Sequence, residues 1–441
     1  MAEASDSEYA DHRVSAPHRR VSSAVGAAVV IAALTGVAAS VIDSVRQASP
    51  PPRPEVTTTE VPWAGSAGPQ RNIACPAGAI DVPTGADIQR VVDARPSGTT
   101  FCLKAGVHAI TTAITPKSGH TFVGEYGAVL DGAGWKTTDR TQGAFRAHNQ
   151  DVDDVTIRNL VIRNMPQKGI HAFRDFSDRW TIEFNEIASN QTGVSFPNHS
   201  VLRNNYIHHN VGNPSASDPA ERGGGYAGYQ ATDTILDTNE IAYNGPEQKV
   251  MESVNVTFRN NFVHHNVGDG IWYDGGNPGA VIEKNRVEDN QRNGIFFEAS
   301  HDGVIRDNTV RRSGDTGVFI SASQKAEIHH NQLESNVRGL IYFIDCTLTG
   351  PSRGLDLANN SAHDNTIRVG AQRSAIANGF TYRDCDSTQL AAYLNGSKKL
   401  TFSRNSYYVP SLTGSYWLWN GSQPWSQWRS LGHDMDGAIA P

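Results

Sequence analysis

The chain has 441 residues, a formal net charge of −7 at pH 7 and four cysteines. The negative balance and the lack of a basic stretch exclude nucleic acid as an expected partner, and four cysteines are too few for a disulfide scaffold. The length would suit about two or three ordinary domains, unless the chain is a solenoid, which grows by adding repeats.

The first 42 residues predict a membrane anchor. Residues 1–20 are polar and arginine-containing, whereas residues 21–42 carry no charge and are rich in Ala and Val. That run is long enough to cross a bilayer, and its positive N-terminal flank predicts a short cytoplasmic tail and an exported remainder. A cleaved signal peptide ending near Val37-Ala38-Ala39, and hence a secreted protein, is the alternative. The run is long for a signal sequence, which favours a single-pass cell-membrane protein.

A spacer and a folded domain are expected to follow. Residues 43–74 are rich in Pro and Thr, a composition typical of an extended linker. The folded part is expected over residues 75–441. Near its start, residues 86–92 have apolar residues at helical spacing. An exported domain would allow Cys75–Cys102 and Cys346–Cys385 disulfides, although four cysteines permit three pairings.

Four similar repeats lie between residues 256 and 336. In each, an apolar strand leads to an asparagine, then to an apolar residue, a polar turn, and a glycine followed by a branched apolar residue. A fixed period in this range is typical of a solenoid, and the apolar residues alternate with a period of two, as in strands. The asparagines are 24, 23 and 23 residues apart: Asn261, Asn285, Asn308 and Asn331.

Each repeat predicts one lap of three short strands, since about 22 residues at roughly 3.3 Å each complete such a lap. Asparagine tolerates the left-handed backbone conformation, so we expect the recurring asparagines to adopt it at a turn. Stacked there, their side chains could bond to one another in a ladder.

These repeats resemble the right-handed parallel β-helix family, the fold of pectate lyases and related polysaccharide-active enzymes. The resemblance covers most of the chain after about residue 75. It implies an all-β fold, a right-handed single-stranded parallel β-helix of roughly ten coils. The clearest repeats span 155–345, helix 86–92 would cap the open first coil, and residues 411–441 would cap the last.

The resemblance also implies a carbohydrate substrate. The Asp-Pro-His motif of the alginate epimerase branch is absent, and no stretch reproduces the catalytic motifs of pectate lyases or polygalacturonases cleanly. The resemblance therefore implies the fold and a polysaccharide partner, without a particular reaction.

The best candidate for chemistry is a carboxylate pair, Asp274 and Glu298. Strand alternation turns both side chains outward on successive coils, which places their carboxyl groups about 5 Å apart. One of them should then hold its proton at raised pH. Such a pair could act on a glycosidic bond as in a retaining glycosidase, or could bind Ca²⁺. No other cofactor is expected.

Neighbouring residues predict a substrate site around the pair. Asn213 to Gly224 is an insertion in the repeat, and solenoid insertions often line a binding face. Arg222 from this insertion and Lys249 could bind an anionic sugar or assist β-elimination. Trp272 offers a flat platform for a sugar ring. The predicted substrate contacts are Trp272, His171, Glu221 and Phe296.

Structural alternatives exist for these residues. Outward charges on a sheet are usually solvated, and the apolar row that contains Phe296 could simply lie under a loop at 347–357. The paired histidines follow the repeat and do not converge as metal ligands should. We therefore expect an extracytoplasmic, monomeric polysaccharide-processing protein, a lyase or glycosidase. The alternative is a non-catalytic surface protein that binds glycan or a protein partner.

Overall fold

The computed structural model describes residues 67–172, 176–213, 215–347, 356–370 and 375–441. Within these ranges, no helix has both the length and the apolar character that a membrane span requires. The predicted anchor at residues 21–42 lies outside them, as does most of the predicted linker. Its final part, from residue 67, bonds to the solenoid, because Gly68 N donates to Asn204 O at 2.8 Å.

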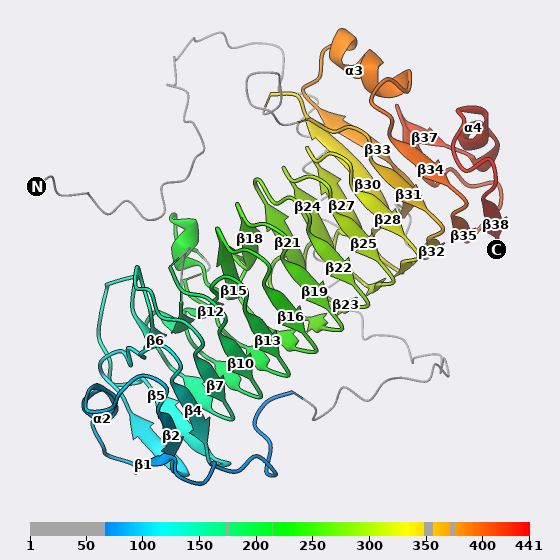
Figure 1. Ribbon diagram of the computed structural model, residues 1–441. Coiled ribbons are helices and arrows are strands. Elements are labelled where there is room, and N and C mark those ends of the chain that lie inside the picture. The colour runs from blue at the N-terminus through cyan, green and yellow to red at the C-terminus, as the bar shows by residue number, and fades with distance from the viewer. Residues whose placement is uncertain (1–66, 173–175, 214, 348–355, 371–374) are drawn as a thin grey trace, which may run out of the picture. The chain divides into compact units, whose positions relative to one another are not determined.

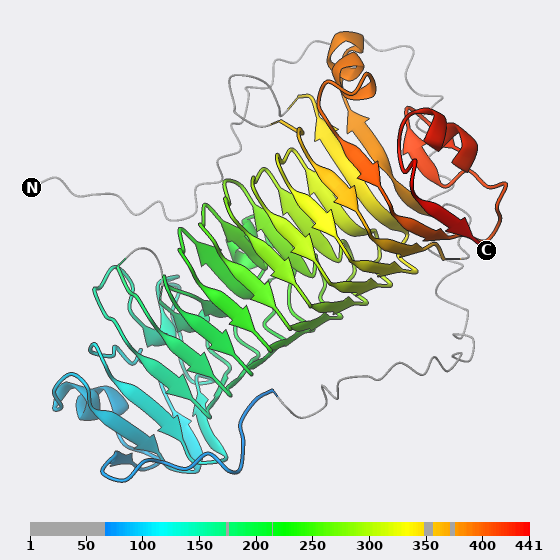
Figure 2. The same cartoon turned by 45° about the vertical axis from the view of Figure 1, so that its right-hand side comes forward.

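The described residues form three long sheets in which each coil contributes one strand to each sheet (Figures 1 and 2). Neighbouring strands are parallel except for β36 and β37. This is a parallel β-helix, as predicted. Two of its sheets have 13 strands and the third has 12. Within the described residues, eleven coils contribute a strand to all three sheets, which agrees with the expectation of roughly ten.

The first sheet has the following strands in spatial order: β1 (Ile80–Val82), β2 (Thr100–Leu103), β4 (Thr121–Gly124), β7 (Thr156–Arg158), β10 (Thr181–Glu183), β13 (Val201–Arg203), β16 (Ile235–Asp237), β19 (Thr257–Arg259), β22 (Val281–Glu283), β25 (Val304–Arg306), β28 (Glu327–His329), β31 (Ser361–His363) and β34 (Thr401–Ser403).

The second sheet has these strands: β3 (Gly106–Ala109), β5 (Ala128–Asp131), β8 (Val161–Arg163), β11 (Glu186–Ala188), β14 (Tyr206–His208), β17 (Glu240–Ala242), β20 (Phe262–His264), β23 (Arg286–Glu288), β26 (Thr309–Arg311), β29 (Gln332–Glu334), β32 (Thr366–Arg368), β35 (Ser406–Tyr408) and β38 (Ala438–Ala440).

The third sheet, which carries the candidate site, has these strands: β6 (Gly143–Arg146), β9 (Lys168–His171), β12 (Thr192–Ser195), β15 (Gly224–Tyr229), β18 (Lys249–Met251), β21 (Ile271–Asp274), β24 (Ile295–Glu298), β27 (Thr316–Ser321), β30 (Arg338–Asp345), β33 (Ile376–Arg383), β36 (Trp417–Trp419) and β37 (Ser422–Gln423).

A ladder of buried asparagines joins the first and second sheets. Asn261 is typical: its backbone N and its Nδ2 both donate to Asn285 Oδ1 at 3.0 Å, and Nδ2 also donates to Leu236 O. The same pattern runs from Asn185 to Asn405, whose two donors reach Asp434 Oδ1. Stacked coils therefore satisfy polar groups that would be costly to bury alone.

The left-handed conformation was assigned to the wrong residue. The ladder asparagines are not among the positive-φ residues; the residue immediately before each one is. Phe184, Thr238 and Lys284 have φ values of 56°, 56° and 55°. The turn therefore requires left-handed geometry one position earlier, and the ladder selects asparagine for its side-chain donor and acceptor.

The ends of the solenoid are closed by caps. Helix α2 (Ile88–Asp93) begins at the N-cap Asp87 and buries Ile88 and Val92, and Figure 1 shows it beside the first strands. The two predicted disulfides, Cys75–Cys102 and Cys346–Cys385, are both present. Near the other end lie helices α3 (Ser387–Leu394) and α4 (Trp425–Ser430). Buried Trp417 and Trp428 fill the last coils, which protects the final strands from pairing.

Candidate functional site

The predicted carboxylate pair lies on neighbouring strands of the third sheet. Met251 of β18 is paired with Asp274 of β21, which is paired in turn with Glu298 of β24. Strands in a sheet are about 4.8 Å apart, so the two acidic side chains stand side by side. The register deduced from the sequence was correct at these positions.

Each carboxylate has a different partner. Lys249 Nζ lies 3.0 Å from Asp274 Oδ2 and 4.6 Å from the centroid of the Trp272 ring. The indole Nε1 of Trp272 donates to Glu298 Oε2 at 3.2 Å. An ammonium group thus faces Asp274, whereas a neutral donor faces Glu298.

The environment of Glu298 raises its pKa. Burial and, to a smaller extent, the nearby Asp274 carboxylate raise the pKa of Glu298 to about 7, against the opposing effects of the Trp272 hydrogen bond and Lys249. Glu298 is therefore partly protonated at neutral pH. A carboxyl group in this condition can both donate and accept a proton during a reaction.

Buried side chains hold the start of β21 in place. The Tyr226 hydroxyl accepts a hydrogen bond from Trp272 N at 3.2 Å. Gln248 Nε2 donates to Gly270 O at 2.8 Å and to Asp269 O at 3.0 Å. Because Tyr226 and Gln248 are buried, these bonds position the strand that carries Trp272 and Asp274.

Arg222 reaches the cluster through a glutamate that the sequence analysis missed. Arg222 Nη1 lies 3.2 Å from Glu247 Oε1, and Lys249 Nζ lies 3.8 Å from Glu247 Oε2. Glu247 thus links the inserted segment to the carboxylate pair. The alternation that turned Lys249 outward also applies two residues earlier, and this was the signal that could have found it.

Phe296 lies in the site but is covered. Its ring stacks on Trp272 with a centroid distance of 5.6 Å and packs against Phe319 at 5.1 Å. Only 5% of Phe296 is exposed, so it cannot offer its ring face to a substrate. Its contribution to the site is to support the Trp272 ring. The loop suggested at 347–357 lies largely outside the described residues.

His171 lies away from the carboxylates. It is on β9, three strands from β18 in the order of the third sheet, and is only 2% exposed. Its Nε2 lies 3.1 Å from His148 Nδ1. Burial holds the pKa of His171 well below its usual value, with the nearby Lys168 charge contributing. The sequence could place the residue outward but could not show that it would be covered.

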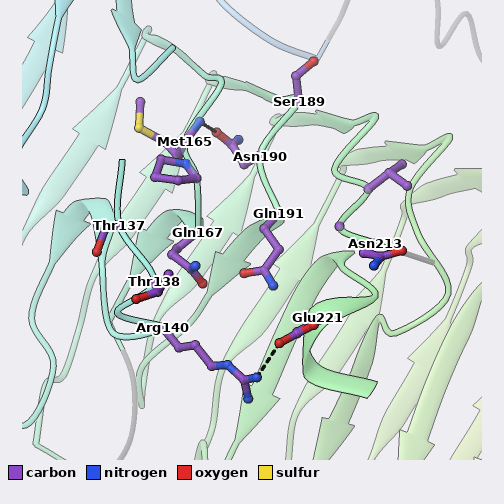
Figure 3. A pocket seen from close by; sticks show the side chains of 13 residues that line it. Thr137, Thr138, Arg140, Met165, Gln167, Ser189, Asn190, Gln191, Asn213 and Glu221 are labelled. Atoms are coloured by element: carbon purple, nitrogen blue, oxygen red, sulfur yellow. Dashed lines mark hydrogen bonds and ion pairs between the residues drawn. The ribbon is translucent and has the colours of Figure 1, made fainter. Parts of the chain in front are cut away.

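Glu221 lies beside a cavity of about 450 Å³ and not at the carboxylate pair. It belongs to the short helix η1 (Pro219–Glu221), and its Oε1 accepts a hydrogen bond from Arg140 Nη2 at 2.7 Å. Figure 3 shows this pair at one side of the cavity, with Gln167 and Gln191 extending into it. The insertion therefore lines a hollow, as expected, but Glu221 faces the hollow whereas Arg222 faces Glu247.

Sequence comparison now identifies the family. The family described as "Right handed beta helix region" matches residues 143–277 and, overlapping them, 222–368. Together these matches cover slightly more than half of the chain and include the whole carboxylate cluster. The chain belongs to the right-handed β-helix family. A search of curated proteins found no match.

Two solved structures show the same right-handed β-helix fold. The A-module of mannuronan C-5 epimerase AlgE6 from Azotobacter vinelandii is 16% identical, with a TM-score of 0.62 over 80% of this chain and 94% of that chain. The A-module of AlgE4 from the same organism is also 16% identical, with a TM-score of 0.51 over 78% and 98% of the two chains. At this identity the likeness concerns the fold alone.

The carboxylate pair of this β-helix protein is a poor calcium site. Calcium takes six to eight oxygen ligands, whereas Lys249 occupies Asp274 and Glu298 is partly protonated. Across the described ranges, the single close group of three metal-ligating side chains is Cys75, Cys102 and Glu125. Both cysteines of that group are in a disulfide, so this group does not fit a metal.

Proposed function

We propose that this β-helix protein hydrolyses glycosidic bonds in a polysaccharide, at the Asp274–Glu298 pair on the third sheet. One observation carries the proposal: of two adjacent carboxyl groups, Asp274 lies against an ammonium group and Glu298 has a raised pKa, which separates their environments. Such separation is how enzymes assign acid and nucleophile roles to like residues. The spacing of neighbouring strands, about 4.8 Å, is near the roughly 5 Å separation of carboxyl groups in retaining glycosidases.

In this mechanism Glu298 is the general acid and then the general base. It donates its proton to the glycosidic oxygen as that bond breaks, while the Asp274 carboxylate attacks the anomeric carbon and forms a glycosyl ester. The deprotonated Glu298 next takes a proton from water, whose oxygen attacks the same carbon and releases Asp274. Lys249 contacts the Asp274 carboxylate, and Trp272 orients Glu298.

The charge balance favours hydrolysis over elimination. Elimination on a uronate needs a cation to stabilise the substrate carboxylate. Lys249 is bound to Asp274, and Arg222 is bound to Glu247. Two cations therefore face three acidic side chains, which leaves no net positive charge in this cluster to recruit an acidic sugar.

The disulfides support action outside the cytoplasm, since such bonds persist in oxidising compartments. We accordingly propose that residues 21–42 anchor a monomer in the cell membrane, with the β-helix exported. Secretion after signal cleavage is the alternative, which the apparent mass of the mature protein would reveal.

A non-catalytic glycan-binding role is the second candidate. The observation that favours it is a row of neighbouring aromatic rings, the first pair stacked and the next two tilted, that extends from the carboxylate pair toward the C-terminus. The centroid distances are 5.6 Å for Trp272–Phe296, 5.1 Å for Phe296–Phe319 and 5.5 Å for Phe319–Phe343. Such a row could bind sugar without any cleavage, where its rings are accessible.

The test is to incubate the purified protein with a panel of neutral and uronic polysaccharides. Hydrolysis predicts new reducing ends without the ultraviolet absorbance of an unsaturated uronate, and D274N should abolish them. Unsaturated products would contradict hydrolysis in favour of a lyase. Binding without any new ends would support the second candidate.

A further inference from the structure

The cavity beside Glu221 has its own chemical character. This open hollow is lined by Thr137, Thr138 and Arg140, by two corner turns near residues 167 and 191, and by the insertion. Its volume of about 450 Å³ is within the usual range for small-molecule sites. In Figure 3, amide side chains from different coils extend toward the same space.

The two charged residues that line this cavity are paired with each other. Arg140 and Glu221 are the charged residues of its lining, and they form a 2.7 Å ion pair. The other terminal nitrogen of Arg140 lies 2.6 Å from Asp218 Oδ2. Arg140 is thus shared between two carboxylates, and an incoming anion would have to compete with both.

The remaining lining combines amides and hydroxyls with a small apolar surface. Thr138 and Gln167 face the cavity on one side, while Met165 and Val211 contribute apolar contacts. Gln167 Oε1 is buried and has no hydrogen-bond partner within the described ranges. A buried acceptor without a hydrogen bond costs free energy, and a ligand hydroxyl that donates to it would remove that cost. Hydroxyl groups set on an apolar ring are the chemistry of an uncharged sugar.

We propose that this cavity binds an uncharged sugar residue of the polysaccharide, a subsite distinct from the carboxylate pair. The inference rests on the proposed function for the identity of the ligand as a glycan. It names a neutral polysaccharide as the substrate, because neither the cavity nor the Lys249 cluster offers an uncompensated cation.

The position of the subsite sets a length requirement. Gln191 precedes β12, and Trp272 is on β21, three steps along the third sheet. At about 4.8 Å per step, the cavity and the cleavage site are roughly 15 Å apart. A disaccharide cannot span them, whereas an oligosaccharide of several residues can.

The experiment measures the binding of neutral and uronic oligosaccharides of equal length by calorimetry. The full-length E298Q variant serves as the background, so that no ligand is consumed. We expect the neutral oligosaccharide to bind more tightly than the uronic one. Adding T138A and Q167A should weaken the neutral ligand about tenfold, since two hydrogen bonds are lost.

Adding Q332A instead is the matched control. Gln332 is an exposed glutamine on β29 of the second sheet, so its loss should leave the affinity unchanged. Thermal melts followed by circular dichroism confirm that each variant folds. Unchanged affinity in the folded T138A/Q167A variant, tighter binding of the uronic ligand, or no glycan binding at all would each overturn the subsite.

The subsite and the proposed reaction can fail separately. Binding that depends on Thr138 and Gln167 in a protein without hydrolytic activity would retain the subsite and reject the reaction. Hydrolysis of a neutral polysaccharide that is insensitive to T138A/Q167A would do the opposite.

Discussion

Two glutamates on one coil, the buried Glu288 and the half-buried Glu298, show how neighbouring charges give one a structural role and the other a chemical one. Glu288 ends β23 and Glu298 ends the next strand, β24. Burial acts to raise the pKa of Glu288, but a hydrogen bond from Arg286 and the charges of Arg286, Arg312 and Arg311 outweigh it, and the pKa is lowered. Burial likewise raises the pKa of Glu298, where Asp274 adds to the effect.

The comparison shows that burial alone does not define a reactive acid. What differs is the charge that neighbouring coils place beside each carboxyl group. Arg312 Nη2 lies 2.9 Å from Glu288 Oε2 and arrives from the following coil. At Glu298 the preceding coil supplies Asp274 and an indole. A solenoid can therefore hold one glutamate in ion pairs and leave another able to donate a proton.

The largest expected effect distinguishes the two residues by activity. E298Q should lower kcat about a thousandfold, because glutamine cannot transfer the proton. E288Q is the matched control and should change kcat less than about twofold, since Glu288 lies on the second sheet. Initial rates of reducing-end release measure both. Comparable losses in the two variants would contradict the assignment of roles.

A smaller effect concerns pH. Because protonated Glu298 is the proposed acid, kcat/KM should fall about tenfold per pH unit above about pH 7. Lys249 acts to lower the Glu298 pKa, so K249M should move this limb to higher pH while lowering the maximum rate. A pH–rate profile of the wild type without a limb near neutrality would reject Glu298 as the acid.

The smallest effect is on stability, with opposite signs for the two sites. The folded pKa of Glu298 is above its ordinary value of 4.5, so ionisation destabilises the fold as pH rises from about 4.5 to 7. E298Q should therefore gain stability relative to wild type over that range, by up to about 3 kcal/mol.

The folded pKa of Glu288 is below its ordinary value. Its stabilising contribution is present above the ordinary pKa and is lost as pH falls through the folded value. E288Q should therefore be less stable than wild type at neutral pH, and the difference should shrink in acid. Denaturant unfolding at several pH values measures both variants. Differences of the same sign at both sites would contradict the comparison.

The sequence predicted those features that follow from the regular length of one solenoid repeat. Residues one lap apart must become neighbours, so the side-by-side placement of Asp274 and Glu298 and the position of Lys249 followed from counting. The caps and both disulfide pairs could be proposed from local patterns in the chain. The extra strands at the two ends could not be counted, because the end coils near β1 and β38 lack the asparagine signal.

The sequence could not predict what depends on side-chain packing across irregular segments. Glu221 and Arg222 are adjacent in the insertion, yet one pairs with Arg140 and the other with Glu247. The periodic pattern does not describe an insertion, so it gives no direction for either side chain. The hydrogen bond from the Trp272 indole to Glu298 could not be predicted either, because it depends on the rotamer of Trp272 and not on the register of the strands.

The asparagine ladder makes the two ends of the β-helix chemically unequal. Every rung donates in the same direction along the axis, and the final rung is a carboxylate whose other oxygen already accepts from the Tyr407 hydroxyl and the Trp428 indole. A carboxylate has no proton to pass onward, so no further coil, from this chain or from a second molecule, can extend the series. Asp434 thereby acts as a chemical stop against head-to-tail fibre growth, to which open-ended stacks of strands are prone.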